Sequence, residues 1–287
     1  MLLLIGFIIV FAAVMGGFML AGGHPAVLLH VSEFVVIGGV ALGILVVASP
    51  FSTLKLTFTK ILKAFKGSAS KVENVDLLKM LFELFTLGRK GGVIALEEHL
   101  SNPKGSSILS KYPTFVNNHH RVDFLCNSLR PIVDGRCKPE QLNDVLDHDL
   151  EAKEEEADGP IHVLQLIGDS LPGVGIVAAV LGIINTMAAI AEGPEAVGEK
   201  VAAALTGTFL GILAAYGFVN PLTSRIKANN GMELLYFKSI KKGVIAFAGG
   251  MAPIMAVEIS RRCLDHTVQP AADELEETLK NLNSTPS

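Results

Sequence analysis

Two long uncharged segments are the strongest feature of the hydrophobic pattern along the chain. The first covers residues 170–191 and the second covers residues 201–224, with only residues 192–200 between them. A helix needs about 20 apolar residues to cross a hydrocarbon core of about 30 Å. Because the connection is so short, the two helices must be antiparallel. The pattern therefore predicts a transmembrane hairpin.

Two further apolar segments occupy the N-terminal region. Residues 1–32 are uncharged and are interrupted by Gly22-Gly23-His24-Pro25, and residues 34–54 follow almost at once. The first segment has a length suited to a signal peptide, but it lacks the basic n-region that such a peptide carries. We therefore expect two uncleaved helices joined by a short loop, which makes four transmembrane helices in all.

Positively charged residues set the expected orientation, because lysine and arginine concentrate on the cytoplasmic side of membrane proteins. The two loops on the opposite side, residues 21–32 and 192–200, hold a single lysine between them. This bias predicts that both termini and residues 55–163 lie in the cytoplasm. The basic residues that follow the second and fourth helices are Lys55, Lys60, Lys63, Lys66, Lys71, Arg225 and Lys227.

The segment between the second and third helices has a helical pattern of its own. Apolar residues recur at helical spacing over 72–85, until the glycine-rich sequence 88–92 ends that helix. Further helices are expected over 118–133 and from Pro139 through Leu150 into an acidic tail. We thus expect an all-α membrane protein with a helical cytoplasmic domain inserted between transmembrane helices 2 and 3. Its expected parts are transmembrane helices 1 and 2 in residues 1–54, the cytoplasmic domain in 55–163, the hairpin in 164–225 and a cytoplasmic C-terminal region in 226–287.

Composition and motifs exclude several classes of function. The chain has 287 residues, half of them hydrophobic, and a net charge of -4, which argues against nucleic acid as a main partner. Cys126, Cys137 and Cys263 show no metal-ligand spacing and no pairing pattern, so we expect reduced thiols. Because the sequence has no phosphate loop, no zinc-protease helix and no nucleophile elbow, we expect neither enzymatic activity nor a cofactor or metal.

The hairpin itself contains no Asp, Glu, Lys, Arg or His within its two apolar segments. Ion and proton carriers normally place an ionisable group inside the membrane, so a partner must supply the carboxylate if this hairpin takes part in conduction. Glu33 lies at the mouth of the second helix. It is either a functional carboxylate or, as we expect, an interfacial cap at the helix N-terminus. The hairpin's own polar groups are the hydroxyls of Thr186, Thr206, Thr208 and Tyr216.

Pro172 and Pro221 lie about twenty residues from the connection in either direction, so both are expected at the same depth, about 30 Å below it. Proline removes a backbone donor and tends to kink a helix. Two prolines at one level indicate either a place where the hairpin bends or a packing feature of the kind that membrane helices tolerate. Small residues also recur every four positions on the second helix of the hairpin and allow another helix to come close. They are Ala203, Gly207, Gly211 and Ala215.

Three stretches resemble a single family. Residues 168–182, GDSLPGVGIVAAVLG, resemble the third transmembrane segment of the flagellar motor stator subunit MotA. Residues 207–218, GTFLGILAAYGF, followed by Pro221, resemble its fourth segment, and residues 88–97, GRKGGVIALE, resemble its charged cytoplasmic loop. The likeness covers nearly the whole chain, which resembles the MotA branch of the MotA/TolQ/ExbB proton-channel superfamily.

The resemblance implies a stator subunit of the bacterial flagellar motor in the inner membrane. Such subunits form a ring of five copies around the helices of two MotB-like subunits, and the MotB-like helix supplies the proton-accepting Asp. The ring converts proton flow into torque on the switch complex of the rotor. By their places in the family motifs, the resemblance implies rotor contacts at Arg89, Glu97 and Asp149, coupling of conduction to movement at Pro172 and Pro221, and lining of the ion path by Ala179, Thr208 and Tyr216.

Ala179 bears on which ion is used. Sodium-driven relatives tend to carry threonine at this position, whereas a methyl group offers no oxygen ligand and hard cations need several. The alanine therefore favours protons. The alternatives are a sodium-driven stator subunit, a TolQ/ExbB-type energiser of envelope processes, whose members have three transmembrane helices, and a scaffold that conducts nothing.

Overall fold

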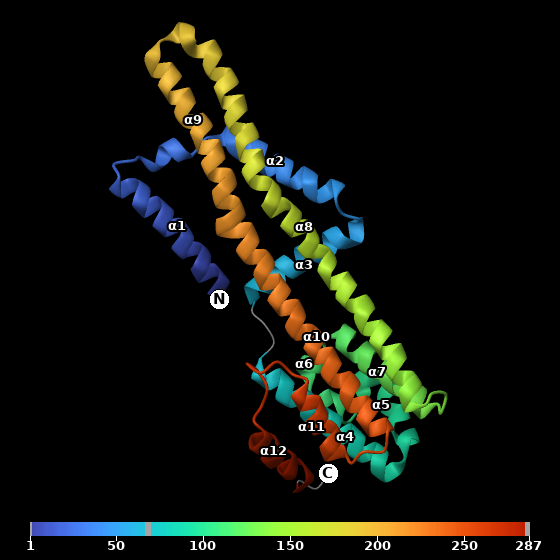
Figure 1. The fold of residues 1–287 in the computed structure, drawn as a ribbon. Coiled ribbons are helices and arrows are strands. Elements are labelled where there is room, and N and C mark those ends of the chain that lie inside the picture. Colours follow the sequence, from blue (N-terminus) through green and yellow to red (C-terminus); the bar gives the residue numbers. More distant parts are fainter. Residues whose placement is uncertain (1, 67–69, 285–287) are drawn as a thin grey trace. The chain divides into compact units, whose positions relative to one another are not determined.

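The computed structural model describes residues 2–66 and 70–284, and Figure 1 shows their fold. Within this part of the chain every regular element is a helix, which confirms the all-α fold class. The helices form two compact units. The first unit consists of Met1–Gly67 with Ala157–Ala228, and the second unit consists of Ser68–Glu156 with Asn229–Ser287.

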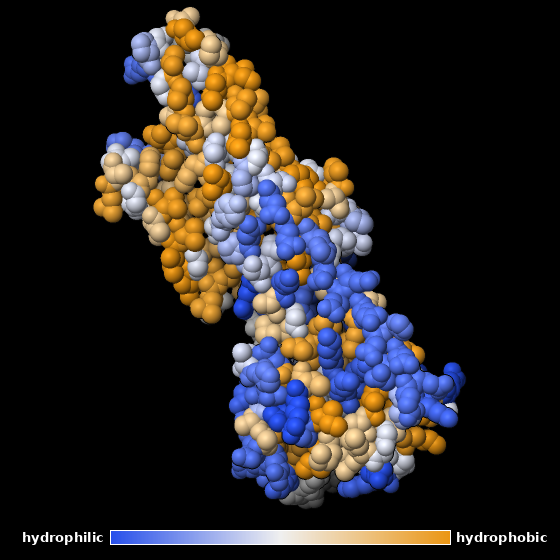
Figure 2. All heavy atoms as spheres, in the orientation of Figure 1, coloured by the Kyte–Doolittle hydropathy of each residue, from blue (hydrophilic) through white to orange (hydrophobic). Residues whose placement is uncertain are grey.

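The first unit holds the apolar helices. Four helical segments of the described chain are long and apolar enough to cross a membrane. Helix α1 has no buried residue, and hydrophobic side chains cover much of the surface of the first unit in Figure 2, as is typical of helices that face lipid. The elements of the first unit are α1 (Leu2–Leu20), η1 (Pro25–Leu28), α2 (Val31–Val47), α3 (Phe51–Lys66), α8 (Pro139–Ala188) from residue 157 onward, η5 (Ala189–Glu192), α9 (Pro194–Leu213), the π-helix η6 (Ala214–Val219) and the start of α10 (Asn220–Ala248).

The second apolar helix differs from the predicted 34–54. Helix α2 begins and ends earlier, at Val31–Val47, and a separate helix, α3, begins at Phe51. The break falls at Ser49-Pro50, because proline disfavours the helical conformation of the residue before it. Four of the lysines that were expected directly after the second span, from Lys55 to Lys66, therefore lie on α3.

Helix α8 is a single helix of 50 residues, Pro139–Ala188. The sequence predicted a helix from Pro139 through Leu150 into an acidic tail, and the structure extends this helix without a break into the apolar segment that begins at Ser170. Alanine, glutamate and lysine, which fill residues 151–157, are strong helix formers, so the acidic stretch continues the helix. The acidic side chains at 154–156 are exposed, as expected for a solvated face.

The second unit has a core of its own. Helix α4 contributes Leu78 and Phe85 to it, α7 contributes Phe124, and α10 contributes Tyr236 and Phe247. The rings of Phe85 and Phe247 stack with centroids 4.7 Å apart, so residues after the hairpin share one core with residues before it. Its elements are α4 (Lys71–Gly91), η2 (Val93–Leu96), α5 (Glu97–Ser101), η3 (Pro103–Gly105), η4 (Leu109–Lys111), α6 (Pro113–Val116), α7 (His119–Val133), α8 up to residue 156, the rest of α10, α11 (Pro253–Arg262) and α12 (Ala272–Ser284).

Helix α4 ends within the glycine-rich sequence 88–92, as predicted, although not at its first glycine, Gly88. Gly88 lies inside the helix, where a Cβ atom would come within 2.7 Å of the Phe247 ring, so the close packing of α10 requires glycine. The helix ends instead at Gly91. Gly92 then adopts a φ of 79°, a backbone conformation that residues with a side chain rarely adopt.

An arginine–carboxylate cluster fixes the end of α11. Both Glu258 oxygens accept hydrogen bonds from Arg261, at 2.7 and 2.8 Å, and one of them also accepts from Arg262 at 2.8 Å. Arg261 in turn donates to the carbonyl of Pro270 at 3.1 Å, which ties α11 to the following loop. The hydrogen bond from Arg261 is the main cause that lowers the pKa of Glu258 from 4.5 to about 2.

We predict that Glu258→Gln lowers the free energy of unfolding by about 1–2 kcal/mol at neutral pH, because water screens part of the roughly 3 kcal/mol that such a pKa shift represents. The pKa of Glu258 is lower in the folded chain, so its stabilisation is present above pH 4.5 and disappears as the pH falls to about 2. Thermal unfolding of the detergent-solubilised chain at several pH values measures this difference.

The control is Glu277→Gln on α12, which removes an exposed carboxyl group that forms no ion pair within the described residues. It should leave stability unchanged at every pH. A stability loss in Glu258→Gln that is the same at pH 3 and pH 7 would contradict the assignment of the ion pair.

Candidate functional site

Helices α8 and α9 of the first unit approach so closely that no side chain fits between them. A Cβ atom on Gly211 would lie 2.6 Å from the carbonyl oxygen of Leu171 and 2.7 Å from the Cα of Gly175. A Cβ on Gly175 would lie 2.9 Å from the carbonyl oxygen of Gly207. In a membrane such small-residue contacts let helices associate through backbone packing.

The small residues singled out in the sequence occupy unequal places at this contact. Gly207, Gly211 and Ala215 are buried, whereas Ala203 is only half-buried. Its neighbour Ala204 is fully packed and lies where a Cβ on Gly182 would approach within 2.9 Å. Gly207 and Gly211 therefore face helix α8 of the same chain.

Pro221 lies beside irregular helix geometry, whereas Pro172 lies inside the continuous helix α8. A π-helix, Ala214–Val219, directly precedes Asn220 and Pro221. Proline lacks the N–H that would continue the helical ladder, and a π turn is one way in which a helix accommodates that loss. The side-chain amide oxygen of Asn220 fills the space beside Gly168, one turn before Pro172. Pro172 and Pro221 thus lie within one turn of a single contact between the two helices.

The three residues expected to line an ion path differ in exposure on the single chain. Ala179 is 9% exposed and lies against Gly207, and Thr208 is half-buried. Tyr216, in the π-helix, is 66% exposed on the single chain. Two other hydroxyls are used within their own helices, since Thr186 donates to the carbonyl of Gly182 and Thr206 to that of Ala202, both at 2.9 Å.

Glu33 is a site that the sequence interpretation misjudged. An interfacial cap would be exposed, but Glu33 is only 4% exposed in the first turn of α2. Its Oε1 accepts a 3.4 Å hydrogen bond from Ser32, and its Oε2 is buried without a partner. The same Oε2 lies 2.6 Å from the point where a Cβ on Gly207 would stand. The available signal was that Glu33 is the sole acidic residue among the apolar N-terminal helices.

In the second unit, Arg89 and Glu97 are exposed at the junction of α4, η2 and α5. Arg89 lies in the last turn of α4, next to Gly88, and Glu97 begins α5, next to Leu96. Leu96 is fully buried against Gly88, with 3.2 Å between its Cδ1 and a Cβ built on the glycine. The two charges therefore flank one rigid contact, and neither forms an ion pair within the part of the chain that is described.

Asp149 lies on α8, half-buried, with Lys153 Nζ 3.7 Å from its carboxylate. A stronger ion pair, which the sequence did not indicate, forms two residues earlier. Asp147 pairs at 2.5 Å with Lys241 of α10, whose side chain is 3% exposed, and this hydrogen bond lowers the pKa of Asp147. The pair lines a groove of about 560 Å³ with Lys238, Arg262 and His266.

The chain matches known proteins over nearly its whole length. Residues 4–92 match the family described as Motility protein A N-terminal, and residues 117–239 match the MotA/TolQ/ExbB proton channel family. Motility protein A of Salmonella typhimurium is 34% identical over 281 residues, which cover 98% of this chain and 95% of the relative. The chain belongs to the motility protein A family.

Relatives and solved structures agree with this membership of the motility protein A family. Motility protein A of Escherichia coli is 33% identical over the same shares of the two chains. The structure of C. jejuni MotAB has the same fold, with a TM-score of 0.76 at 23% identity over 92% of this chain and 95% of that chain. The flagellar MotAB stator complex from Bacillus subtilis has a TM-score of 0.73 at 25% identity over 96% and 98%.

The helix crossing generates a prediction about this motility protein A relative. We predict that Gly211→Ala lowers the free energy of unfolding by about 1–3 kcal/mol and reduces accumulation in the membrane, because its methyl group meets backbone atoms that cannot turn aside. Immunoblots of membranes and thermal unfolding of the purified protein measure both effects. The control is Gly198→Ala on α9, where nothing lies within 4 Å and the better helix propensity of alanine should stabilise slightly. Equal behaviour of the two variants would contradict the close crossing.

Proposed function

We propose that this chain is the stator subunit that couples proton flow to rotation of the flagellum. The observation that carries the proposal is the end-to-end similarity to Motility protein A, at 34% identity. As a member of that family the chain is a flagellar stator subunit of the proton-channel class. The family matched by residues 117–239 includes TolQ and ExbB as well as MotA. The family matched by residues 4–92 is named for motility protein A, which supports a stator subunit over a TolQ/ExbB-type energiser.

The proposal places four transmembrane helices in the inner membrane with both termini in the cytoplasm. It follows the predicted division into residues 1–54, 55–163, 164–225 and 226–287, with the two outer loops facing the periplasm. The four apolar helical segments and the basic helix α3 after the second span support this topology. The second unit is then the part that faces the rotor.

A MotB-like partner completes the proposed channel. The two solved relatives are MotAB complexes, and the apolar segments of α8 and α9 lack any ionisable residue that would carry a proton between them. We assign to the partner the acidic side chain that exchanges the proton, and to this chain the ring, proposed as a pentamer, that surrounds it. Ala179, Thr208 and the exposed Tyr216 are the proposed lining, and the methyl group of Ala179 favours protons over sodium.

The partner's role is tested by conduction. We predict that cells expressing this chain alone hold their cytoplasmic pH as steadily as cells with an empty vector, because the apolar segments of the hairpin offer no carboxylate. Co-expression with a MotB-like subunit should produce a proton leak that disappears when the partner's membrane aspartate is replaced by asparagine. A leak from this chain alone would show that the ionisable group is not supplied by the partner.

The rotor face is tested by reversing its charges. We predict that Arg89→Glu with Glu97→Lys cripples swimming while the ring still assembles in the membrane, since exposed charges steer a partner and contribute little to folding. Swimming rate and membrane content of the chain measure the two effects. Lys104→Glu with Glu140→Lys reverses two exposed charges elsewhere in the second unit and should leave swimming intact. Normal swimming of the first pair would mean that Arg89 serves only to cap the end of α4.

The prolines are tested by torque. We predict that Pro172→Ala and Pro221→Ala proteins accumulate in the membrane and bind the partner, yet produce little or no torque, because the restored N–H straightens the helix at the level of the π turn. Counting membrane-bound units while torque is recorded on tethered cells separates a hinge from a packing feature. Pro160→Ala, elsewhere on α8, should keep torque per unit unchanged. Wild-type torque per unit in the Pro172 and Pro221 variants would refute the hinge.

A further inference from the structure

Glu33 is a buried acid for which the proposed function has no role. It is 4% exposed, and its Oε2 finds no hydrogen-bond partner among the described residues. Its Oε1 has one long contact, 3.4 Å from the hydroxyl of the adjacent Ser32. A carboxylate that served as a helix cap would accept hydrogen bonds from backbone N–H groups of its own helix, and Glu33 accepts none.

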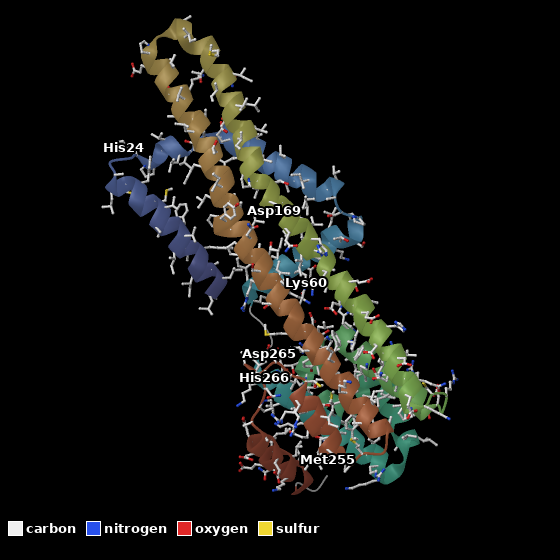
Figure 3. The ribbon with its side chains drawn as sticks, in the orientation of Figure 1. His24, Lys60, Asp169, Met255, Asp265 and His266 are labelled. Carbon is white, nitrogen blue, oxygen red and sulfur yellow. The ribbon has the colours of Figure 1, made fainter. Side chains whose placement is uncertain are left out.

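Among the described residues, the parts of α8 and α9 that pack near Glu33 carry no charged side chain that could balance its charge. The hairpin faces Glu33 with Gly207 of α9, and the described residues of α8 and α9 have no ionisable side chain over 170–188 or 201–213. The nearest ionisable residues on those helices are Asp169 of α8, which is exposed, and Lys200 of α9, about 10 Å along the axis from Gly207. Figure 3 labels Asp169 on α8 and His24 in the loop before η1.

The ionisable residue nearest to Glu33 along the chain is His30, which directly precedes α2. Its Nδ1 is also buried without a partner. A buried carboxylate without a cation or a donor is costly, whereas the neutral acid is tolerated in an apolar setting. Oε2 of Glu33 is in such a setting, buried and without a hydrogen-bond partner among the described residues. The imidazole of His30, about one turn before Glu33 at the N-terminus of α2, is suited to pass protons to Glu33.

The position of Glu33 relates it to the ion path. A Cβ on Gly207 would meet Glu33 Oε2 at 2.6 Å on one side and the backbone nitrogen of Ala179 at 3.2 Å on another. Gly207 is thus the point of contact between the acid and the stretch of hairpin that carries Ala179 and Thr208. It lies about 10 Å along α9 from Lys200 and about 20 Å before Pro221, on the half of the hairpin nearer the connecting turn.

From this placement we propose that Glu33 is a proton-binding site of this chain, on the outer half of the proton path. The inference rests on the proposed function and adds to it a second exchangeable group besides the partner's acid. His30 accepts a proton from a hydronium ion on the outer side, which becomes water, and then releases a proton to the Glu33 carboxylate, where an O–H bond forms as the N–H bond breaks. The O–H bond breaks when the proton passes to the partner's carboxylate, which leaves Glu33 ionised for the next proton. Charge and atoms balance without any other reactant.

The test combines chemical labelling with flux on the chain co-purified with its MotB-like partner in proteoliposomes. Dicyclohexylcarbodiimide modifies protonated carboxyl groups in apolar surroundings, and peptide mass spectrometry locates the adduct. We expect modification of Glu33 in the wild type at about pH 7. Proton flux should fall on the order of tenfold or more in Glu33→Gln, which keeps the shape and lacks the exchangeable proton, and should be partly retained in Glu33→Asp. Glu199→Gln, an exposed acid at the start of α9, should conduct normally.

Each outcome decides the proposal. Wild-type flux in an assembled Glu33→Gln complex, or the absence of a Glu33 adduct in a conducting wild type, would overturn it. If Glu33→Gln fails to bind the partner, the wild type provides the test. A Glu33 adduct that inhibits flux supports the proposal, and an adduct that leaves flux unchanged overturns it. A wild-type complex that passes no protons would contradict the proposed function, and the labelling of Glu33 would then stand alone as the measure of a protonated buried acid.

Discussion

The backbone contact between α8 and α9 is the constraint on which the rest of the first unit depends. In a bilayer, apolar burial does not drive one helix against another, so association relies on close packing. Gly175 and Gly211 allow this because their missing side chains let carbonyl oxygens of the facing helix approach. One turn before Gly211, Gly207 leaves the space into which Glu33 Oε2 projects. The same contact therefore joins the hairpin and positions its neighbouring acid.

Features that weaken a helix lie inside and directly beside this fixed contact. On α8, Pro172 lies between Leu171 and Gly175, which both face Gly211, and on the other helix the π-helix that starts at Ala214 leads away from Gly211 to Pro221. Regular α-helix resists bending, whereas a proline and a π turn both weaken the hydrogen-bond ladder locally. A rigid crossing next to two weakened segments is an arrangement in which a small change at the crossing is converted into a change of helix direction.

The second unit is held together by different physics. Its core gains stability from buried leucine and phenylalanine side chains, including the stacked pair Phe85 and Phe247. Glycine again permits the closest approach, at Gly88, but here an aromatic ring fills the space. The packing of Leu96 on Gly88 gives Arg89 and Glu97 fixed places without using either charge for an internal ion pair. Charges that are held in place and left unpaired are available to an outside partner.

The sequence by itself determined the helical class, the apolar segments and the lack of ionisable residues in the apolar parts of the hairpin, because each of these depends on the composition of one continuous stretch. Family motifs added the candidate roles of Arg89 and Pro172. Only the tertiary structure decided that α4 continues through Gly88, since the reason is Phe247, far along the chain. It also decided that Glu33 is buried rather than a cap. A hydrophobic pattern indicates whether a residue suits lipid or water, but the surroundings of a single carboxyl group depend on the helix that packs against it, and that helix is encoded elsewhere in the chain.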